Sequence, residues 1–196
     1  MLAPMLGTVG FALFILYDFN SILWCSRWLR CAFAAGIVLI FAATVLMCVQ
    51  AFIDGAFAGI GDVILLCLAL LALLALIYSL FFALPFDKTY VSQENGRKVY
   101  TCGLYAACRH PGILFFFVFY LLLGLAALPT EILVCGMYFS VLNLLYAFIQ
   151  DRYTFPKSFT DYDRYRSLSP FLIPNKASIK RCISTWGYSY EKEGEL

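Results

Sequence analysis

The stretch LLCLALLALLAL, residues 65–76, carries no charged, amide or hydroxyl side chain. It forms the centre of an apolar segment that covers about residues 62–85. At about 1.5 Å per residue, a helix of this length crosses a hydrocarbon core of about 30 Å. Hydrocarbon offers no hydrogen-bond partners, so every backbone polar group must be paired within the segment itself. The segment is therefore predicted to be a membrane-spanning helix.

The rest of the chain has the same character. Of its 196 residues, 63% are hydrophobic and only 13% are charged, whereas a soluble domain carries about 25% charged residues. Five apolar segments are long enough to span a membrane, the fourth only barely. They cover about residues 5–24, 31–53, 62–85, 112–128 and 132–150. We predict an all-α polytopic membrane protein with five transmembrane helices in a single domain over residues 1–196.

The positions of the basic residues orient these helices. All 14 Lys and Arg residues lie between the first and second segments, between the third and fourth, or after Gln150. The other connections and the N-terminus carry none. The positive-inside rule then places the N-terminus outside and the C-terminus in the cytoplasm. Because the basic residues follow the membrane face and no glycine-rich phosphate loop occurs, we expect no nucleic-acid partner.

The eight cysteines are expected to be reduced thiols. Five lie in the predicted cytoplasmic parts, three lie within spans, and no Cys-x-x-Cys pair occurs. This distribution argues against a thiol oxidoreductase. The simplest interpretation is that the cysteines are small buried hydrophobic residues, and we expect no metal site.

Two cytoplasmic parts are expected to be ordered. In the loop over residues 86–111, the stretch TYVSQENGRKVYT (residues 89–101) is typical of a β-hairpin with its turn at the Asn-Gly dipeptide. In the cytoplasmic segment 151–196, an amphipathic helix at the membrane interface is predicted. It is indicated by three aromatic residues at helical spacing among charged ones: Phe159, Tyr162 and Tyr165.

Polar side chains within the spans gather toward the predicted cytoplasmic ends. They are Asp18 and Asn20 in the first span, Tyr78 and Ser79 in the third, and Asn143 and Tyr146 in the fifth. This layer predicts a cavity that opens to the cytoplasm, with Asp18, Asn143 and Tyr146 as candidate substrate-cavity residues. Asp18 is the only charged residue well inside a span, a position that often marks function. Alternatively, it reaches the headgroups or pairs with Arg27 or Arg30.

The single histidine of the chain lies in CRHPG, residues 108–112, at the start of the fourth span. Pro111 suits the first position of a helix, because its missing N–H needs no partner there. The free N–H groups of that first turn favour a carboxylate or another anion. Arg109 adds a positive charge, and His110 can donate or accept a hydrogen bond near neutral pH. The alternative is that Arg109 and His110 merely anchor the helix at the headgroups.

The wider pattern resembles the isoprenylcysteine carboxyl methyltransferase and phospholipid methyltransferase superfamily. Its members typically show G-x-Y-x-x-x-R-H-P before a membrane helix. Acidic residues, an F…Y-x-x-Y element and a proline-containing stretch follow the next pair of helices. Here the pattern reads Gly103, Tyr105, Arg109, His110 and Pro111, then Asp151, then Phe159, Tyr162 and Tyr165, then SPFLIP at 169–174. The resemblance covers about residues 86–175.

This resemblance implies a membrane-embedded methyltransferase that uses S-adenosylmethionine. A lipophilic acceptor, either a small molecule or a lipidated substrate, would enter from the bilayer. The implied cofactor-binding residues are Gly103, Tyr105, Arg109, His110 and Pro111, and the implied catalytic residues are Asp151 and Arg152. A carboxylate acceptor needs no general base, and Arg109 or Arg152 would position it. An amine or hydroxyl acceptor would lose its proton to Asp151.

The chain also departs from the family pattern. The family usually continues R-H-P-x-Y-x-G, where this chain has Ile113 and Phe115, and Gln150 stands where a glutamate is usual. The main alternative is therefore a non-catalytic relative that acts as a membrane scaffold or binds lipid. An NADPH-dependent sterol-type reductase is a further alternative, although the Asn and Tyr of its R-H-P-N-Y-like signature are missing. The compact form favours a bacterial inner or plasma membrane over the endoplasmic reticulum.

Overall fold

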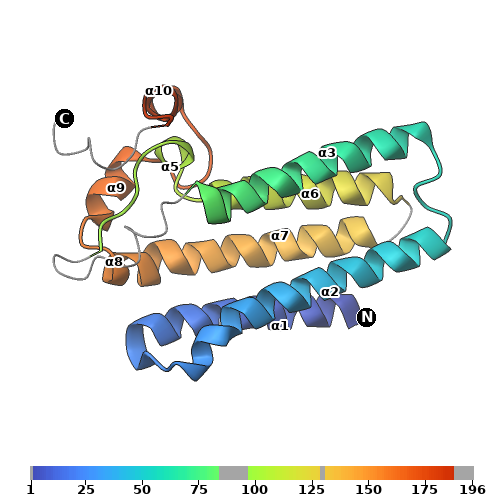
Figure 1. Ribbon diagram of the computed structural model, residues 1–196, viewed down its shortest axis with the longest axis horizontal. Helices are drawn as coiled ribbons and strands as arrows, with labels where there is room; N and C mark the ends of the chain where they lie inside the picture. Colours follow the sequence, from blue (N-terminus) through green and yellow to red (C-terminus); the bar gives the residue numbers. More distant parts are fainter. Residues whose placement is uncertain (1, 84–96, 129–130, 188–196) are drawn as a thin grey trace. The chain divides into compact units, whose positions relative to one another are not determined.

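The computed structural model describes residues 2–83, 97–128 and 131–187, and within these ranges all regular structure is helical (Figure 1). The α-helices are α1 (Leu2–Phe19), α2 (Cys31–Ile53), α3 (Ile60–Ile77), α5 (Leu104–Ala107), α6 (Pro111–Ala126), α7 (Ile132–Ile149), α8 (Phe155–Ser158), α9 (Tyr162–Leu168) and α10 (Lys176–Ser184). Short π-helical or 3₁₀ turns are η1 (Asn20–Trp24), η2 (Trp28–Arg30), η3 (Tyr78–Phe82) and η4 (Gln150–Thr154). The all-α prediction is confirmed for the described residues.

Four helices are long and apolar enough to cross a membrane. With their flanking turns they cover Leu2–Trp24, Trp28–Ile53, Ile60–Phe82 and Ile132–Ser158. They match the first, second, third and fifth predicted spans. The predicted fourth span, residues 112–128, corresponds to α6, which has 16 residues. A helix of that length is about 24 Å long, shorter than a hydrocarbon core of about 30 Å.

The chain divides into two compact units. Unit 1 contains Met1–Leu74 and Phe115–Thr154, and unit 2 contains Ala75–Leu114 and Phe155–Leu196. Unit 1 therefore holds α1, α2, α7 and most of α3 and α6. Unit 2 holds the Arg-His-Pro motif and the C-terminal helices.

In unit 1, α1 packs against both α2 and α7 (Figure 1). The crossing of α1 and α2 depends on two glycines, Gly10 and Gly36. A Cβ atom on Gly36 would lie 2.7 Å from the backbone oxygen of Gly10 and 2.6 Å from the Phe14 ring. Small residues at such crossings let membrane helices approach closely, which favours van der Waals packing where no hydrophobic effect operates.

Hydroxyl pairs join further helices of unit 1. The Thr8 and Tyr138 hydroxyls of α1 and α7 lie 2.8 Å apart. Thr44 of α2 and Tyr120 of α6 form the corresponding pair at 2.6 Å. Each pair satisfies polar groups that would otherwise face apolar surroundings, so these bonds help to fix helix register.

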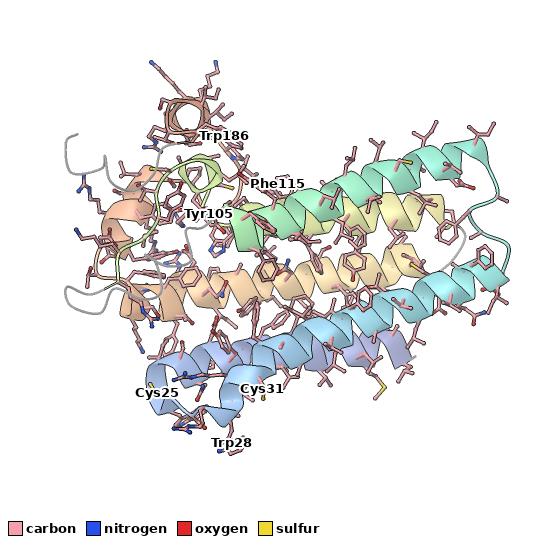
Figure 2. The ribbon with its side chains drawn as sticks, in the orientation of Figure 1. Cys25, Trp28, Cys31, Tyr105, Phe115 and Trp186 are labelled. Atoms are coloured by element: carbon pink, nitrogen blue, oxygen red, sulfur yellow. The ribbon has the colours of Figure 1, made fainter. Side chains whose placement is uncertain are left out.

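The turn between α1 and α2 is closed by Asn20. Its side chain accepts a hydrogen bond from the Ser26 backbone N–H at 2.9 Å and donates to the Ser26 carbonyl at 3.0 Å. Beside this turn, Trp24 and Trp28 are exposed, and Figure 2 shows Trp28 pointing away from the helices. Exposed tryptophans at the ends of apolar helices are typical of the membrane–water interface.

Three long helices, α1, α3 and α7, continue at their C-terminal ends into the π-helical turns η1, η3 and η4. These turns lie where the sequence places its polar residues: Asn20, Ser79 and Asp151 belong to them, and all three are buried. Such π-helical turns occur often at functional sites. Of the predicted polar layer, Asn20, Tyr78 and Ser79 therefore lie in irregular helix ends, whereas Asp18, Asn143 and Tyr146 lie in the regular helices α1 and α7.

Unit 2 is built around Tyr162, Tyr165 and Val99, which are buried together. The two tyrosines thus contact protein, which differs from the prediction of an interfacial aromatic face. Of the predicted hairpin, residues 89–96 lie outside the described residues. The following residues pair with the C-terminal segment: the Arg97 carbonyl accepts from the Thr160 N–H at 3.0 Å, and the Val99 N–H donates to Asp161 at 2.9 Å.

The amphipathic helix of the C-terminal segment is α10. It opens with a capping box in which Asn175 and Ser178 bond reciprocally to each other's backbone N–H groups at 2.9 Å. This device satisfies two of the free donors at a helix start. The helix starts at Lys176, 17 residues after Phe159, where the predicted aromatic face begins. The prediction fell on the earlier segment because the aromatic residues there show a helical spacing of their own.

Candidate functional site

Arg109 joins the Arg-His-Pro motif to the C-terminal segment within unit 2. Its Nη1 donates to the backbone carbonyl of Arg166 at 3.0 Å and to that of Ser169 at 2.6 Å. Its backbone N–H donates to the Pro170 carbonyl at 2.9 Å. These carbonyls lie at the C-terminal end of α9, where helical acceptors lack partners and a cation is favourable.

His110 is buried between two phenylalanines of the C-terminal segment. Its ring stacks on Phe155, with centroids 5.7 Å apart, and meets Phe171 edge-on at 5.0 Å. The imidazole therefore fixes the entry to α6, whose first residue is Pro111, as the sequence predicts. Phe155 was not singled out by sequence analysis, since one phenylalanine among many carries no distinguishing pattern.

Tyr105 and Tyr165, both expected from the family pattern, also meet in unit 2. The Tyr165 hydroxyl donates to the Tyr105 carbonyl at 2.7 Å, and the Tyr105 hydroxyl donates to the Ser79 carbonyl of η3 at 2.8 Å. Together with the contacts of Arg109 and His110, these bonds join two segments of unit 2 that lie about 60 residues apart in the sequence. The sequence pattern named both tyrosines but did not predict the hydrogen bonds between these residues.

A cavity of about 160 Å³ lies in unit 2. It is lined by Tyr78, Phe82, Ala83, Tyr100, Gly103, Leu104, Trp186 and Gly187. Gly103 adopts a φ of 57°, in the region that favours glycine, and its N–H donates to Thr185 Oγ1 at 3.0 Å. Of the predicted cofactor residues, Gly103 lines this cavity, while Arg109 and His110 contact the C-terminal segment. Sequence analysis missed Tyr100 and Trp186, which nothing in their local pattern marks.

The lining of this cavity fits S-adenosylmethionine in kind. Aromatic rings stack on a nucleobase and attract a cation such as a sulfonium. Trp186, labelled in Figure 2, is half-exposed. The volume is below the roughly 300–1,000 Å³ of pockets that enclose a whole small-molecule ligand. The cavity is therefore too small to enclose a whole molecule of this cofactor.

Asp151 and Arg152, the two predicted catalytic residues, differ in their exposure. The Asp151 side chain is buried, whereas Arg152 is exposed with its guanidinium 5.5 Å from the centre of the Phe148 ring. Consecutive residues of a helical turn lie on different faces of the helix, and this holds for Asp151 and Arg152 in η4. The two residues therefore lie in different surroundings in unit 1, and their catalytic roles stay predictions.

Of the predicted substrate-cavity residues, two come together in unit 1. The Asp18 carboxyl interacts with the side chains of Tyr146 and Gln150, although its Oδ2 has no hydrogen-bond partner among the described residues, and Gln150 Nε2 donates to the Tyr146 hydroxyl at 2.8 Å. Asn143 is half-buried one turn before Tyr146. The larger cavity of unit 1 is lined by none of the predicted three. Asp18 is thus part of a buried polar cluster formed by α1, α7 and η4.

All eight cysteines are free thiols. Cys108, beside the Arg-His-Pro motif, is 1% exposed, and burial raises the pKa of its thiol to about 11. Because the thiolate is the reactive form, Cys108 should resist a maleimide at pH 8. Cys25, which is exposed in the turn after α1, should react in the same sample. Mass spectrometry of the two peptides measures both rates, and equal rates would contradict the described burial.

No protein-family model, no curated protein and no solved structure matches this chain. The family resemblance therefore depends on the motif residues alone. Among the residues that the structure describes, no three His, Cys, Asp or Glu side chains are grouped as metal ligands.

Proposed function

We propose that this chain is a membrane methyltransferase that moves a methyl group from S-adenosylmethionine to a lipophilic acceptor at the cytoplasmic leaflet. The observation that carries the proposal is the docking of the Arg-His-Pro motif on the C-terminal segment. The superfamily pattern links these two segments, and in unit 2 they are joined by the bonds of Arg109 and Tyr165. A chance match of letters gives no reason for the matched residues to contact one another.

The proposal includes five spans with the N-terminus outside. In this topology α6 is the short fourth span, and the basic residues at both ends of the α1–α2 turn face the cytoplasm. Arg27 and Arg30 lie there beside the exposed Trp24 and Trp28. Basic residues next to interfacial tryptophans support a cytoplasmic position for this turn.

In this proposal the predicted cofactor residues have two kinds of role. Gly103, with Tyr100 and Trp186, would contact the cofactor in the cavity of unit 2. Arg109 and His110 are positioning residues, because their contacts to the C-terminal segment hold that cavity in shape. When bound, S-adenosylmethionine supplies a methyl carbon made electrophilic by its sulfonium. The chain's task is alignment of the acceptor, which is the main requirement of a direct displacement.

The acceptor decides whether Asp151 takes part. A carboxylate attacks without losing a proton, so no base is needed. An amine or hydroxyl must release a proton when it accepts the methyl group. The buried carboxylate of Asp151, in η4, is the candidate base that takes this proton.

One observation favours the alternative of a non-catalytic, lipid-binding relative. Arg109 and His110, the most distinctive motif residues, contact backbone carbonyls and phenylalanine rings of the chain itself. Such contacts maintain a fold whether or not catalysis occurs. An assay of methyl transfer separates the two candidates.

Membranes that contain the chain should transfer label from methyl-labelled S-adenosylmethionine into their lipid extract, above membranes without it. A methyl ester would release its label as methanol in alkali, whereas a methylated amine would retain it. If the product is alkali-stable, Asp151→Asn should lower the rate at least about a hundredfold, the scale of general-base catalysis. Asp163→Asn, an isosteric change at an exposed aspartate of α9, is the matched control. Equal labelling with and without the chain would overturn the proposal.

A further inference from the structure

Unit 1 contains an apolar groove between α1 and α7 that the proposed methyl transfer does not use. Its volume is about 350 Å³, within the range of cavities that hold small ligands. It is lined by Thr8, Phe11, Ala12 and Ile15 of α1 and by Leu142, Leu145, Phe148 and Ile149 of α7. Thr8 contributes the only hydroxyl, and that hydroxyl lies 2.8 Å from the Tyr138 hydroxyl. The lining therefore offers hydrocarbon contact along its length.

The groove lies on two helices that are each long and apolar enough to cross a membrane. Its residues recur at spacings of three and four, so they form one stripe on each helix. Ala12 is exposed and its methyl group is the smallest side chain of the lining. A groove on such helices is open to lipid, and an extended hydrocarbon chain fits its shape and chemistry.

A positive charge marks one end of this groove. Arg152 follows the last lining residues of α7 by one turn, and its guanidinium lies 5.5 Å from the centre of the Phe148 ring, which lines the groove. The side chain is exposed, and no described acid forms an ion pair with it. The neighbouring acids, Asp18 and Asp151, are both buried. Arg152 is therefore available to an anionic group at the end of a span.

We propose that the α1–α7 groove binds one acyl chain of an anionic phospholipid of the bilayer, whose phosphate contacts Arg152. The apolar lining contacts the acyl chain of the lipid. The guanidinium of Arg152 contacts the headgroup, because arginine binds phosphate through two parallel hydrogen bonds. The charge complementarity favours an anionic lipid over a zwitterionic one. This inference does not depend on the proposed methyl transfer.

The test is native mass spectrometry of the detergent-purified chain with phosphatidylglycerol and with phosphatidylcholine of equal chain length. The parent should bind phosphatidylglycerol about fivefold more tightly, the effect of one arginine near a headgroup. Arg152→Gln should remove this preference. Ala12→Phe, which fills the groove, should weaken the binding of both lipids. Arg164→Gln, at an exposed arginine of α9 in unit 2, is the control and should keep the preference.

Two results would overturn the inference. Equal binding of the two lipids by the parent would show that the charge of Arg152 selects no headgroup. Unchanged binding by Ala12→Phe, in a variant with the parent's melting temperature, would show that lipid binds elsewhere. Ile15→Ala is a second variant of the groove, in case Ala12→Phe fails to fold. It widens the groove rather than filling it, and it should retain the preference for phosphatidylglycerol.

Discussion

Replacing Arg109 by alanine should lower the free energy of opening of unit 2 by about 2–4 kcal/mol. The change removes two charge-assisted hydrogen bonds, to the carbonyls of Arg166 and Ser169, and the contact of the guanidinium with Phe171. It also leaves carbonyls at the end of α9 without these donors. Arg109→Lys should recover only part of the loss, because an ammonium cannot reproduce the planar fork of a guanidinium.

Cys108 provides the measurement. Its thiol is buried in unit 2, so it reacts when the unit opens. A loss of about 2–4 kcal/mol raises the population of the open form roughly 30- to 1,000-fold, and the labelling rate should rise accordingly when reclosing is fast. Arg164→Ala removes the same charge from an exposed position on α9 and should leave the rate near that of the parent. A parent-like rate in Arg109→Ala would show that the motif does not hold the C-terminal segment.

Replacing Gly36 by valine should disrupt the crossing of α1 and α2. The new Cβ would lie 2.7 Å from the Gly10 carbonyl oxygen, a backbone atom that cannot rotate away. The helices must separate, and with them the packing of Phe14. We expect a loss of about 3 kcal/mol or more, at the upper end of overpacking in a close-packed core.

Gly61→Val is the matched control for this prediction. It makes the same substitution near the start of α3, where a Cβ meets nothing within 4 Å. Glycine and valine differ by less than about 1 kcal/mol in intrinsic helix preference, so a larger difference between the two variants reports packing. The measurement is the midpoint temperature at which the detergent-purified chain loses its monodisperse peak. Similar midpoints for Gly36→Val and Gly61→Val would contradict the described crossing.

Much of the fold follows from apolar length alone. The segment over 65–76 has no alternative to a buried or membrane helix, and the structure places α3 across it. The helix α6 shows the limit of this criterion, because Ala127 and Leu128 continue the apolar run beyond Ala126, the residue at which the helix ends. Apolar composition fixes which residues avoid water, but not where the hydrogen-bonded helix stops.

Less of the candidate site could be predicted. The resemblance to the family pattern singled out Arg109 and Tyr105 before the fourth span and Tyr165 after the fifth. The spacing of motif residues does not predict where their side chains point. The bonds of Arg109 to backbone carbonyls could therefore not be predicted from the sequence. Trp186 lies in a short turn after α10, and its place in a cavity depends on tertiary contacts that no local pattern encodes.

The most direct test of the methyltransferase account is calorimetric titration of the detergent-purified chain with S-adenosylhomocysteine, which needs no knowledge of the acceptor. The account predicts that the parent binds, and that Trp186→Ala binds at least about tenfold more weakly, the value of one lost stacking contact. Trp28→Ala, an exposed tryptophan of unit 1, should bind like the parent. No heat from the folded parent, or binding of NADPH in its place, would contradict the account.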